Sequence, residues 1–376
     1  MQPAEPGIAA AELPLLSVIV PTLDEEAALP VLLADLARQR GLALEVLVGD
    51  GGSTDNTAAI ARAHGAAFIP AARGRGAQMN AAAVRALGRY LLFLHADSRL
   101  DDTDLLARAL ACLRRAEQDH PPVAGHFRLR FLRSRPGHDL AYRFLEAKTG
   151  LNRAHTTNGD QGMLLSRAFF ERLGGFDSSL PFLEDQRLAA AIRAQGRWLT
   201  LPGTIATSAR RFESEGFFRR YLLMGIMMGM YAVGEERFFA RAPGVYRVQA
   251  ATGRLLLGPV FGLLWTMVRK DWGPAQTARI FLRLGRLLRE NAWQAFLLLD
   301  VWLRPNRRED EAPLLRLHDR PVAPCLDFWP MDVLAGALCF FWFMVVLAAW
   351  FGLESGRAKL VTPSDGKSAP ADAPDA

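Results

Sequence analysis

The sequence predicts a doubly wound α/β domain, followed by helices at a membrane and one membrane-spanning helix. Short apolar runs typical of buried strands alternate with helical patterns through the first half of the chain, which predicts the α/β domain. Several of these runs end in acidic residues, which predicts a ligand site at one edge of the sheet. An uncharged apolar stretch near the end of the 376-residue chain predicts the span.

The composition excludes few functional classes, but it indicates which kinds of partner the protein could bind. The formal net charge is +6, and the arginines are spread along the chain, which does not indicate nucleic acid; phosphate-bearing ligands or an anionic membrane fit as well. Cys112, Cys325 and Cys339 show no paired spacing, which argues against a disulfide framework or a zinc site and suits a reducing compartment. Residues 1–14 have no signal-peptide pattern and are expected to be disordered.

Four short apolar runs in the first hundred residues predict buried strands of a parallel sheet. They are Leu15–Pro21, Glu45–Gly49, Ala66–Pro70 and Tyr90–Leu94. Helical patterns separate them, and the first places leucines 29, 32, 33 and 36 on one face. The repeated order of strand, loop and helix predicts helices on both faces of the sheet.

Three of these runs lead into loops that carry carboxylates. Asp24 and Glu25 follow the first, Asp50 and Asp55 the second, and Asp97 the fourth. Each acid alone could be a helix N-cap, but strand ends of a doubly wound sheet converge on one crevice, so the set favours a ligand site. No Gly-x-Gly-x-x-Gly or Gly-Lys-Ser loop follows the first run, which disfavours a dinucleotide enzyme or a phosphate-loop NTPase.

Later segments complete the predicted domain. Gly125–Leu132 alternates like a half-exposed strand, and Trp198–Leu201 predicts a short strand that is followed by a loop. Glu184 and Asp185 open an amphipathic helix. Taken alone, acids in a first helical turn need no function, because they suit the positive end of the helix dipole.

Four segments together resemble the signature segments of family 2 glycosyltransferases, which are inverting enzymes with a GT-A nucleotide-sugar-binding fold. The segments are Val20–Glu25, Gly49–Asp55, Arg73–Asn80 and Phe93–Ser98. The last two are also similar to a bacterial subgroup assigned to arsenosugar biosynthesis. The resemblance covers about residues 15–231 and is specific because several spaced motifs occur in order.

The resemblance implies a site for a nucleotide-diphosphate sugar and a divalent metal. The residues expected to contact the donor are Pro21, Thr22, Asp24, Glu25, Asp50, Arg75, Asp160, Gln161, Arg210 and Arg211. Carboxylates accept hydrogen bonds from ribose and base donors, and arginines can clamp a diphosphate, although a solvated loop is the alternative for the arginines. Asp97 would hold Mg²⁺ or Mn²⁺, which needs only one or two carboxylates beside substrate oxygens and offsets charge on the leaving diphosphate.

The resemblance also implies that the Glu184-Asp185 pair supplies the catalytic base, with Asp185 the first choice and Glu184 the second. Inversion requires one carboxylate to remove the proton of the acceptor hydroxyl. Two residues depart from the family's pattern. Gly51 stands where a second acid is common, which affects a nucleobase contact. His95 stands at the first position of the usual Asp-x-Asp, either as a ligand or as a packed strand-end histidine.

The expected boundaries follow from these patterns. Residues 15–212 form the GT-A domain, and residues 213–303 contain apolar runs that predict interfacial or buried helices. These runs are Phe217–Val233, Leu255–Val268 and Trp293–Leu303. Residues 304–332 read as a linker, residues 333–353 as a transmembrane helix, and residues 354–376 as a disordered tail.

Together these inferences predict an inverting glycosyltransferase in the bacterial inner membrane. It would cross once, with the catalytic domain in the cytoplasm, where nucleotide sugars are found, and would act on a lipid or lipid-linked acceptor. The membrane is an expected partner and nucleic acid is not. The alternatives are a non-catalytic nucleotide-sugar-binding scaffold, which Gly51 and His95 favour, and a nucleotidyltransferase, which should lack the Glu184-Asp185 helix start.

Overall fold

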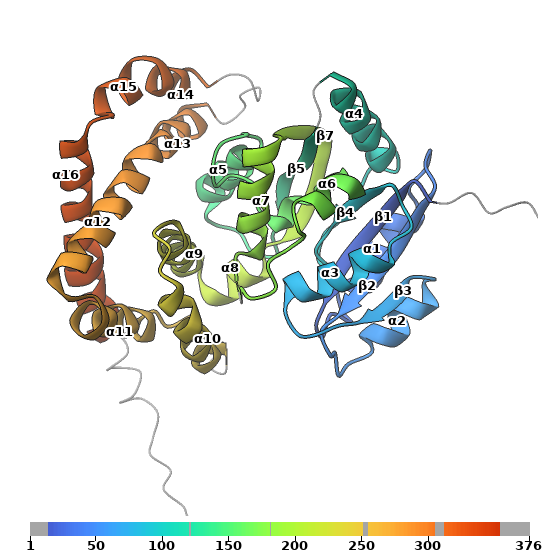
Figure 1. The fold of residues 1–376 in the computed structure, drawn as a ribbon, viewed down its shortest axis with the longest axis horizontal. Coiled ribbons are helices and arrows are strands. Elements are labelled where there is room, and N and C mark those ends of the chain that lie inside the picture. Colours follow the sequence, from blue (N-terminus) through green and yellow to red (C-terminus); the bar gives the residue numbers. More distant parts are fainter. Residues whose placement is uncertain (1–13, 120–121, 181, 251–254, 305–311, 354–376) are drawn as a thin grey trace, which may run out of the picture. The chain divides into compact units, whose positions relative to one another are not determined.

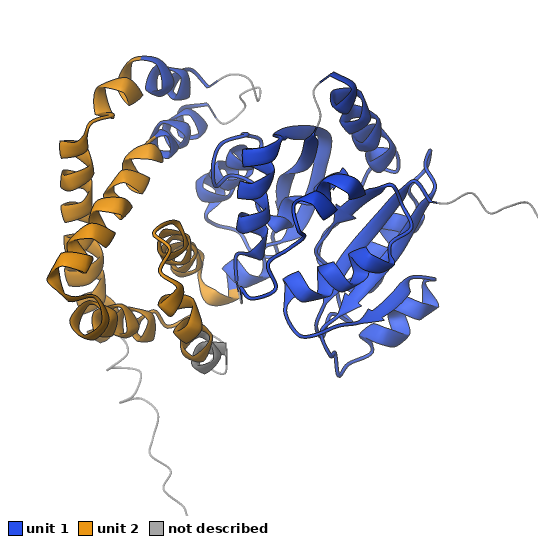
Figure 2. Ribbon diagram, viewed as in Figure 1, with its two compact units in different colours: residues 1–213, 293–320 blue, residues 214–292, 321–376 orange. Residues whose placement is uncertain are grey.

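The computed structural model describes residues 14–119, 122–180, 182–250, 255–304 and 312–353 (Figure 1). The chain divides into two compact units, as Figure 2 shows. Unit 1 comprises residues 1–213 and 293–320, and unit 2 comprises residues 214–292 and 321–376. The ends predicted to be disordered, residues 1–14 and 354–376, lie outside the described residues apart from Pro14.

Unit 1 is built on a seven-stranded sheet with the order β3-β2-β1-β4-β6-β5-β7. The strands are β1 (Leu16–Thr22), β2 (Leu44–Asp50), β3 (Ala67–Pro70), β4 (Tyr90–Phe93), β5 (Val123–Leu132), β6 (Met163–Ser166) and β7 (Arg197–Ser208). The first four confirm the predicted strands, with each end displaced by no more than one residue.

The sheet is mixed, and the four strands that the sequence predicted to be parallel are parallel. β6 runs antiparallel to both β4 and β5, while β1, β2, β3 and β4 pair in parallel, as do β5 and β7. β6 was not predicted, because four residues carry too little periodicity. The carboxyl ends of the parallel strands therefore share an edge with the amino end of β6. The strand predicted to stop at Leu201 continues to Ser208, so Arg210 follows a strand almost directly.

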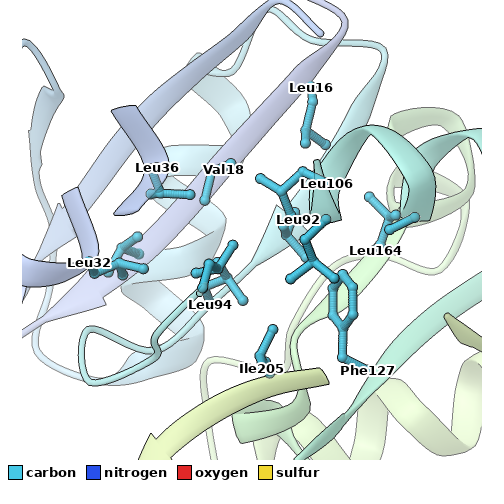
Figure 3. Packing of buried hydrophobic residues seen from close by; sticks show 14 of the residues in the cluster. Leu16, Val18, Leu32, Leu36, Leu92, Leu94, Leu106, Phe127, Leu164 and Ile205 are labelled. Atoms are coloured by element: carbon cyan, nitrogen blue, oxygen red, sulfur yellow. The ribbon is translucent and has the colours of Figure 1, made fainter. Parts of the chain in front are cut away.

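Helices cover both faces of this sheet, as predicted. The helices of unit 1, of which α8 and η3 extend slightly past its boundaries, are α1 (Leu29–Ala37), α2 (Thr57–Ala63), α3 (Arg75–Arg85), α4 (Leu105–Asp119), α5 (Asp139–Thr149), the 3₁₀ helix η1 (Gly159–Gln161), α6 (Arg167–Arg172), α7 (Glu184–Gln195), α8 (Arg210–Glu215), α13 (Trp293–Leu303), α14 (Pro313–Leu317) and η3 (His318–Val322). Side chains of α1, α2 and α4 form one apolar cluster with the sheet (Figure 3), and those of α3, α6 and α7 form the other.

The end of β2 lies unusually close to α3. A Cβ atom added at Gly49 would lie 2.4 Å from the carbonyl oxygen of Gln78. The Gln78 amide donates hydrogen bonds to the carbonyl oxygens of Thr22 and Gly49 and so joins the ends of β1 and β2.

We expect Gly49→Ala to lower the free energy of unfolding by about 1–3 kcal/mol, because the clash is with backbone that cannot move aside. Urea unfolding of the purified protein measures the change. Gly225→Ala is a matched control, since a Cβ there meets no atom within 4 Å and a helical alanine is favourable. Equal stability of the Gly49 variant and the unaltered protein would contradict the packing described.

The described secondary structure of unit 2 consists of helices joined by short turns. Its helices are α9 (Phe217–Ala232), α10 (Glu236–Ala250), α11 (Gly258–Thr266), η2 (Met267–Trp272), α12 (Gly273–Glu290), α15 (Ala323–Leu326), α16 (Trp329–Phe340) and η4 (Phe341–Leu347). One continuous helix, Trp329–Leu353, is long and apolar enough to cross a membrane by length and composition. The described part of the predicted linker is itself helical, because α14, η3 and α15 lie within it.

Candidate functional site

The loops after β1 and β2 are fastened to each other through Asp50. One carboxylate oxygen of Asp50 accepts hydrogen bonds from the hydroxyls of Thr22 (3.0 Å) and Ser53 (2.5 Å), and the other accepts from the backbone N–H groups of Gly52 and Ser53 (2.9 Å each). Burial raises the pKa of Asp50, but these hydrogen bonds outweigh it, so the pKa is lowered below its usual value. Asp50 thus uses all of its roughly four hydrogen-bond acceptor positions to hold the loop that follows β2.

The neighbouring residues predicted to contact the donor lie at the same strand ends. Pro21 and Thr22 are buried at the end of β1. Asp24 is exposed with φ +55°, and one of its carboxylate oxygens accepts a hydrogen bond from the Thr54 N–H (2.8 Å). A Cβ atom at Gly51 would lie 2.7 Å from the amide nitrogen of Gln78. A side chain in place of Gly51 would therefore require the Gln78 side chain to move.

His95, just past the end of β4, forms an ion pair with Asp160 of η1. Its Nδ1 lies 2.6 Å from Oδ1 of Asp160. A Cβ atom at Gly159 would lie 2.9 Å from the other ring nitrogen, so the imidazole packs under the η1 loop, as the packed interpretation expected. Burial raises the pKa of Asp160, but His95 and Arg75 outweigh it, and the net pKa is lowered. Burial lowers the pKa of His95, but Asp160 outweighs it and the pKa is raised. Both shifts favour the charged pair.

Asp97 lies in the same charged neighbourhood. Burial, and then the nearby Asp160 carboxylate, raise the pKa of Asp97, while Arg211 opposes this. Burial and Asp97 raise the pKa of Glu25, and Arg210 and Arg211 oppose that shift. Glu25 and Asp160 each interact electrostatically with Asp97, and the exposed arginines of α8 partly offset the negative charge of this group.

The protein alone provides only part of a metal site. Across the described residues, no three His, Cys, Asp or Glu side chains are arranged to hold a metal ion. The half-buried Asp97 carboxylate receives no hydrogen bond from another described residue. A carboxylate whose one donor is its own backbone N–H, and which interacts with a second carboxylate, fits a Mg²⁺ or Mn²⁺ ion whose other ligands are water and substrate oxygens.

The two acids at the start of α7 have different surroundings. Glu184 is 3% exposed and pairs with Arg75, whose Nε lies 2.9 Å from Oε1 of Glu184. Burial raises the pKa of Glu184 more than Arg75 lowers it. Asp185 is half-buried, and its Oδ2 accepts a hydrogen bond from the Gly159 N–H (2.7 Å). Leu183 precedes them with φ +64°, a strained conformation of the kind found at functional sites.

Gln161 lies away from this cluster. It is fully buried, and its amide donates hydrogen bonds to the carbonyl oxygens of Thr149 (2.9 Å) and Phe127 (3.2 Å). Its carbonyl oxygen accepts from the Asn158 N–H (2.8 Å). The structure therefore uses Gln161 to hold the η1 loop from inside, and does not bring it to the surface where a sugar would bind.

The structure brings together most of the predicted residues from distant parts of the chain. The central set is Glu25, Arg75, Asp97, Asp160, Glu184, Asp185, Arg210 and Arg211. Pro21, Thr22, Asp24 and Asp50 lie at the adjoining strand ends. The sequence predicted no role for Gln78 or Asn80. The side-chain amide of Asn80 donates a hydrogen bond to the carbonyl oxygen of Phe176 and accepts one from the Phe176 N–H. The sequence does indicate both residues in one respect, because they are polar residues within an Ala-rich helix.

We expect Arg75→Met to destabilise unit 1, because it leaves the buried Glu184 carboxylate without its partner. The loss should be about 1–2 kcal/mol in the free energy of unfolding, less than for a fully buried pair because the Arg75 side chain is 43% exposed. Arg73→Met is the matched control: Arg73 is exposed, and the described residues show no ion pair for it. Unchanged stability with weaker donor binding would instead assign Arg75 to the donor, as the sequence predicted.

Part of the chain is similar to known glycosyltransferases. Residues 17–173 match the model of Glycosyl transferase family 2. That segment includes Asp50, Asp97 and Asp160 and ends before Glu184. A PGL/p-HBAD biosynthesis glycosyltransferase of Mycobacterium bovis (strain BCG / Pasteur 1173P2) is 39% identical over 109 residues, which are 26% of this chain and 41% of that protein. A protein of the same description from Mycobacterium tuberculosis (strain ATCC 25177 / H37Ra) matches to the same extent. The chain thus spans 41% of the length of these relatives.

Solved structures are similar at lower identity. The mannosyltransferase PcManGT from Pyrobaculum calidifontis, in complex with GDP-Man and Mn²⁺, has 19% identity and a TM-score of 0.43, covering 92% of this chain and 88% of that chain. TarS residues 1–349 from S. aureus, in complex with UDP, has 18% identity and a TM-score of 0.43, covering 94% and 95%.

Proposed function

We propose that this protein is an inverting glycosyltransferase, which moves a sugar from a nucleotide-diphosphate donor to a hydroxyl group of an acceptor. The family match over residues 17–173 supports the reaction class. The observation that carries the proposal is the placement of Asp185: the Gly159 N–H orients its carboxylate beside Asp160, in the same charged cluster as Asp97.

The donor would bind along the strand ends. Arg210 and Arg211 are exposed, and among the described residues neither has an ion-pair partner, so they are free to bind the diphosphate. Asp97 would hold Mg²⁺ or Mn²⁺, which supplies positive charge where the diphosphate leaves. The loops of Pro21–Glu25 and Asp50 would border the nucleoside, with Asp24 and Glu25 as the carboxylates that still have free acceptor positions.

Asp185 would act as the base. It takes the proton of the acceptor hydroxyl while the oxygen of that hydroxyl bonds to the anomeric carbon of the sugar. The bond between that carbon and the diphosphate oxygen breaks on the opposite side, and the diphosphate leaves with the electron pair, so the configuration inverts. The Gly159 N–H holds Oδ2 and the Gln186 N–H (2.8 Å) holds Oδ1, so the carboxylate is oriented for proton transfer.

We further propose a lipid or lipid-linked acceptor and attachment to the bacterial cytoplasmic membrane, with unit 1 in the cytoplasm. The apolar helix Trp329–Leu353 supports attachment, and its exposed side chains include Leu338 and Trp350. The cytosolic origin of nucleotide sugars supports the orientation.

The test is release of nucleoside diphosphate by detergent-purified protein across a panel of nucleotide sugars, with Mn²⁺, Mg²⁺ or EDTA, and with or without membrane lipid extract. Release that requires metal and lipid supports the whole proposal. Release that needs only a soluble acceptor would overturn the lipid part. Donor binding without turnover would favour the scaffold, and release of pyrophosphate would favour a nucleotidyltransferase.

A further inference from the structure

The outer face of α12 carries a row of exposed arginines. Arg279, Arg283 and Arg286 follow one another at helical spacing, and the exposed Leu282 lies among them. Arg286 pairs with Glu290 (2.8 Å). Among the described residues, no carboxylate pairs with Arg279 or Arg283, although Arg283 donates a long hydrogen bond to the carbonyl oxygen of Val233 (3.4 Å). This face is therefore cationic, with a net excess of positive charge.

The inner face of α12 packs against the apolar helix. A Cβ atom at Gly285 would lie 2.4 Å from the backbone nitrogen of Gly336, so the two backbones are in direct contact. Arg289 at one end of the contact pairs with Asp332 (2.5 Å), and Phe281 at the other contacts Phe340, with 4.9 Å between ring centroids. The two helices consequently run antiparallel along Trp329–Phe340.

The second half of the apolar helix is also backed by a helix that carries exposed cations. Phe261 of α11 stacks on Phe351, with 5.7 Å between ring centroids. η2 continues directly from α11 and exposes Arg269 and Lys270. The first half of Trp329–Leu353 is thus packed against a helix with exposed arginines, and its end contacts α11, which leads into the cations of η2.

The opposite face of the same helix is a continuous apolar stripe. Its exposed members are Val333, Leu334, Leu338, Phe341, Trp342, Val345, Trp350 and Leu353. Trp342 is 54% and Trp350 69% exposed, values that are rare for such residues in a water-facing surface. Unit 2 thus has an apolar stripe backed by helices with exposed cations, the arrangement of an interfacial amphipathic surface.

A crossing of the bilayer is unfavourable for this arrangement. The hydrocarbon core is about 30 Å thick, and an arginine at its centre costs about 2.5–3.5 kcal/mol even on insertion scales. If Trp329–Leu353 spanned that core, the exposed arginines of α12, which packs along Trp329–Phe340, would be carried into it. If the helix lies in the plane of the interface, the stripe meets acyl chains while the cations stay at headgroup level.

We propose that unit 2 binds the surface of an anionic phospholipid bilayer from one side. The stripe enters the interface, and Arg279 and Arg283 bind headgroup phosphates. Both ends of the chain then remain on the same side of the membrane, in contrast to the single crossing expected from the sequence. The inference deepens the membrane attachment proposed above and does not depend on the chemistry of unit 1.

Topology is the first test. The full chain with a peptide tag at each end is expressed in bacteria, and protease access to the tags is compared in sealed spheroplasts and inside-out vesicles. We expect both tags to be digested in inside-out vesicles and both to be protected in spheroplasts. Digestion of only the C-terminal tag in spheroplasts would show a crossing and overturn the proposal.

The lipid contact is tested with the purified full chain and vesicles of phosphatidylcholine with or without phosphatidylglycerol. We expect Arg279→Gln with Arg283→Gln to bind the anionic vesicles about 30-fold more weakly, from about 1 kcal/mol for each arginine. Arg114→Gln with Arg115→Gln, exposed in unit 1, removes the same charge and should leave binding unchanged. An equal loss of vesicle binding in both variants would show that Arg279 and Arg283 are not the binding site. A protein that is dimeric in solution and does not bind vesicles would show that the apolar stripe contacts a second copy of the chain. Release of nucleoside diphosphate is measured in detergent, without vesicles. A protein that is active there but does not bind vesicles would contradict this inference and leave the proposed reaction intact.

Discussion

Replacing Asp185 by Asn should lower kcat for sugar transfer by about 10²- to 10⁴-fold, the usual contribution of a general base. The amide has the shape of the carboxylate, and its oxygen can still accept the hydrogen bond of the Gly159 N–H, although the bond that the other carboxylate oxygen accepts from the Gln186 N–H is lost. It cannot take the acceptor's proton. Donor affinity should therefore stay within a few-fold of the unaltered protein. Initial rates of nucleoside-diphosphate release and donor titration by calorimetry measure the two quantities.

Glu184→Gln is the matched control, because it changes the neighbouring acid in the same helical turn. Glu184 is buried against Arg75, so this variant should lose stability but retain a much larger part of its turnover. The reverse pattern, with Asp185→Asn active and Glu184→Gln inactive and folded, would move the base to Glu184. That outcome would leave the reaction class intact and change the residue that performs the proton transfer.

Replacing Asp97 by Asn should abolish metal-dependent turnover, with a fall of about 10²-fold or more, since a bound cation contributes several kcal/mol of charge stabilisation. The Asp97 carboxylate receives no hydrogen bond from another described residue, so it is free to bind a cation, and the amide that replaces it carries no charge. Binding of Mn²⁺ in the presence of nucleoside diphosphate, followed by electron paramagnetic resonance, should be lost together with activity.

Asp104→Asn provides the matched control for this prediction. It removes one negative charge from an exposed position seven residues along the chain and should leave both Mn²⁺ binding and turnover unchanged. Retained Mn²⁺ affinity in the Asp97 variant would show that Asp160 or Glu25 holds the ion. Turnover that resists EDTA in the unaltered protein would instead assign charge stabilisation to Arg210 and Arg211.

The sequence predicted the strand ends and their acids well, because buried strands and the shared edge of a doubly wound sheet follow from local patterns. It could not predict β6, which is short and depends on pairing with β4 and β5. Nor could it separate Asp160 from Gln161, since the two are adjacent and only the turn of η1 sends one outward and the other into the core. The different surroundings of Glu184 and Asp185 likewise depend on contacts with Arg75 and Gly159, which are distant in sequence.

Local sequence patterns also could not predict which parts of the C-terminal third belong to unit 1 and which to unit 2. Trp293–Leu303 reads like the other apolar runs, but α13 packs on α5 within unit 1. Arg153 stacks on Trp293, with 4.9 Å to the ring centroid, and the amine of Lys148 donates a hydrogen bond to Gln294 (3.3 Å). These contacts are between side chains more than a hundred positions apart, which no pattern within one helix records.

Residues 293–320 belong to unit 1 although residues 214–292 of unit 2 precede them, so unit 1 can be completed only late in synthesis. The ribosome completes the sheet and α5 well before α13, because the whole of residues 214–292 is made in between. At about 5–20 residues per second, that interval lasts roughly 4–16 s. For this time the α5 surface that later receives Trp293 is bare, and the nascent chain needs protection there. A shortened protein that ends near residue 213 would keep this surface bare permanently, so recombinant versions should retain residues 293–320.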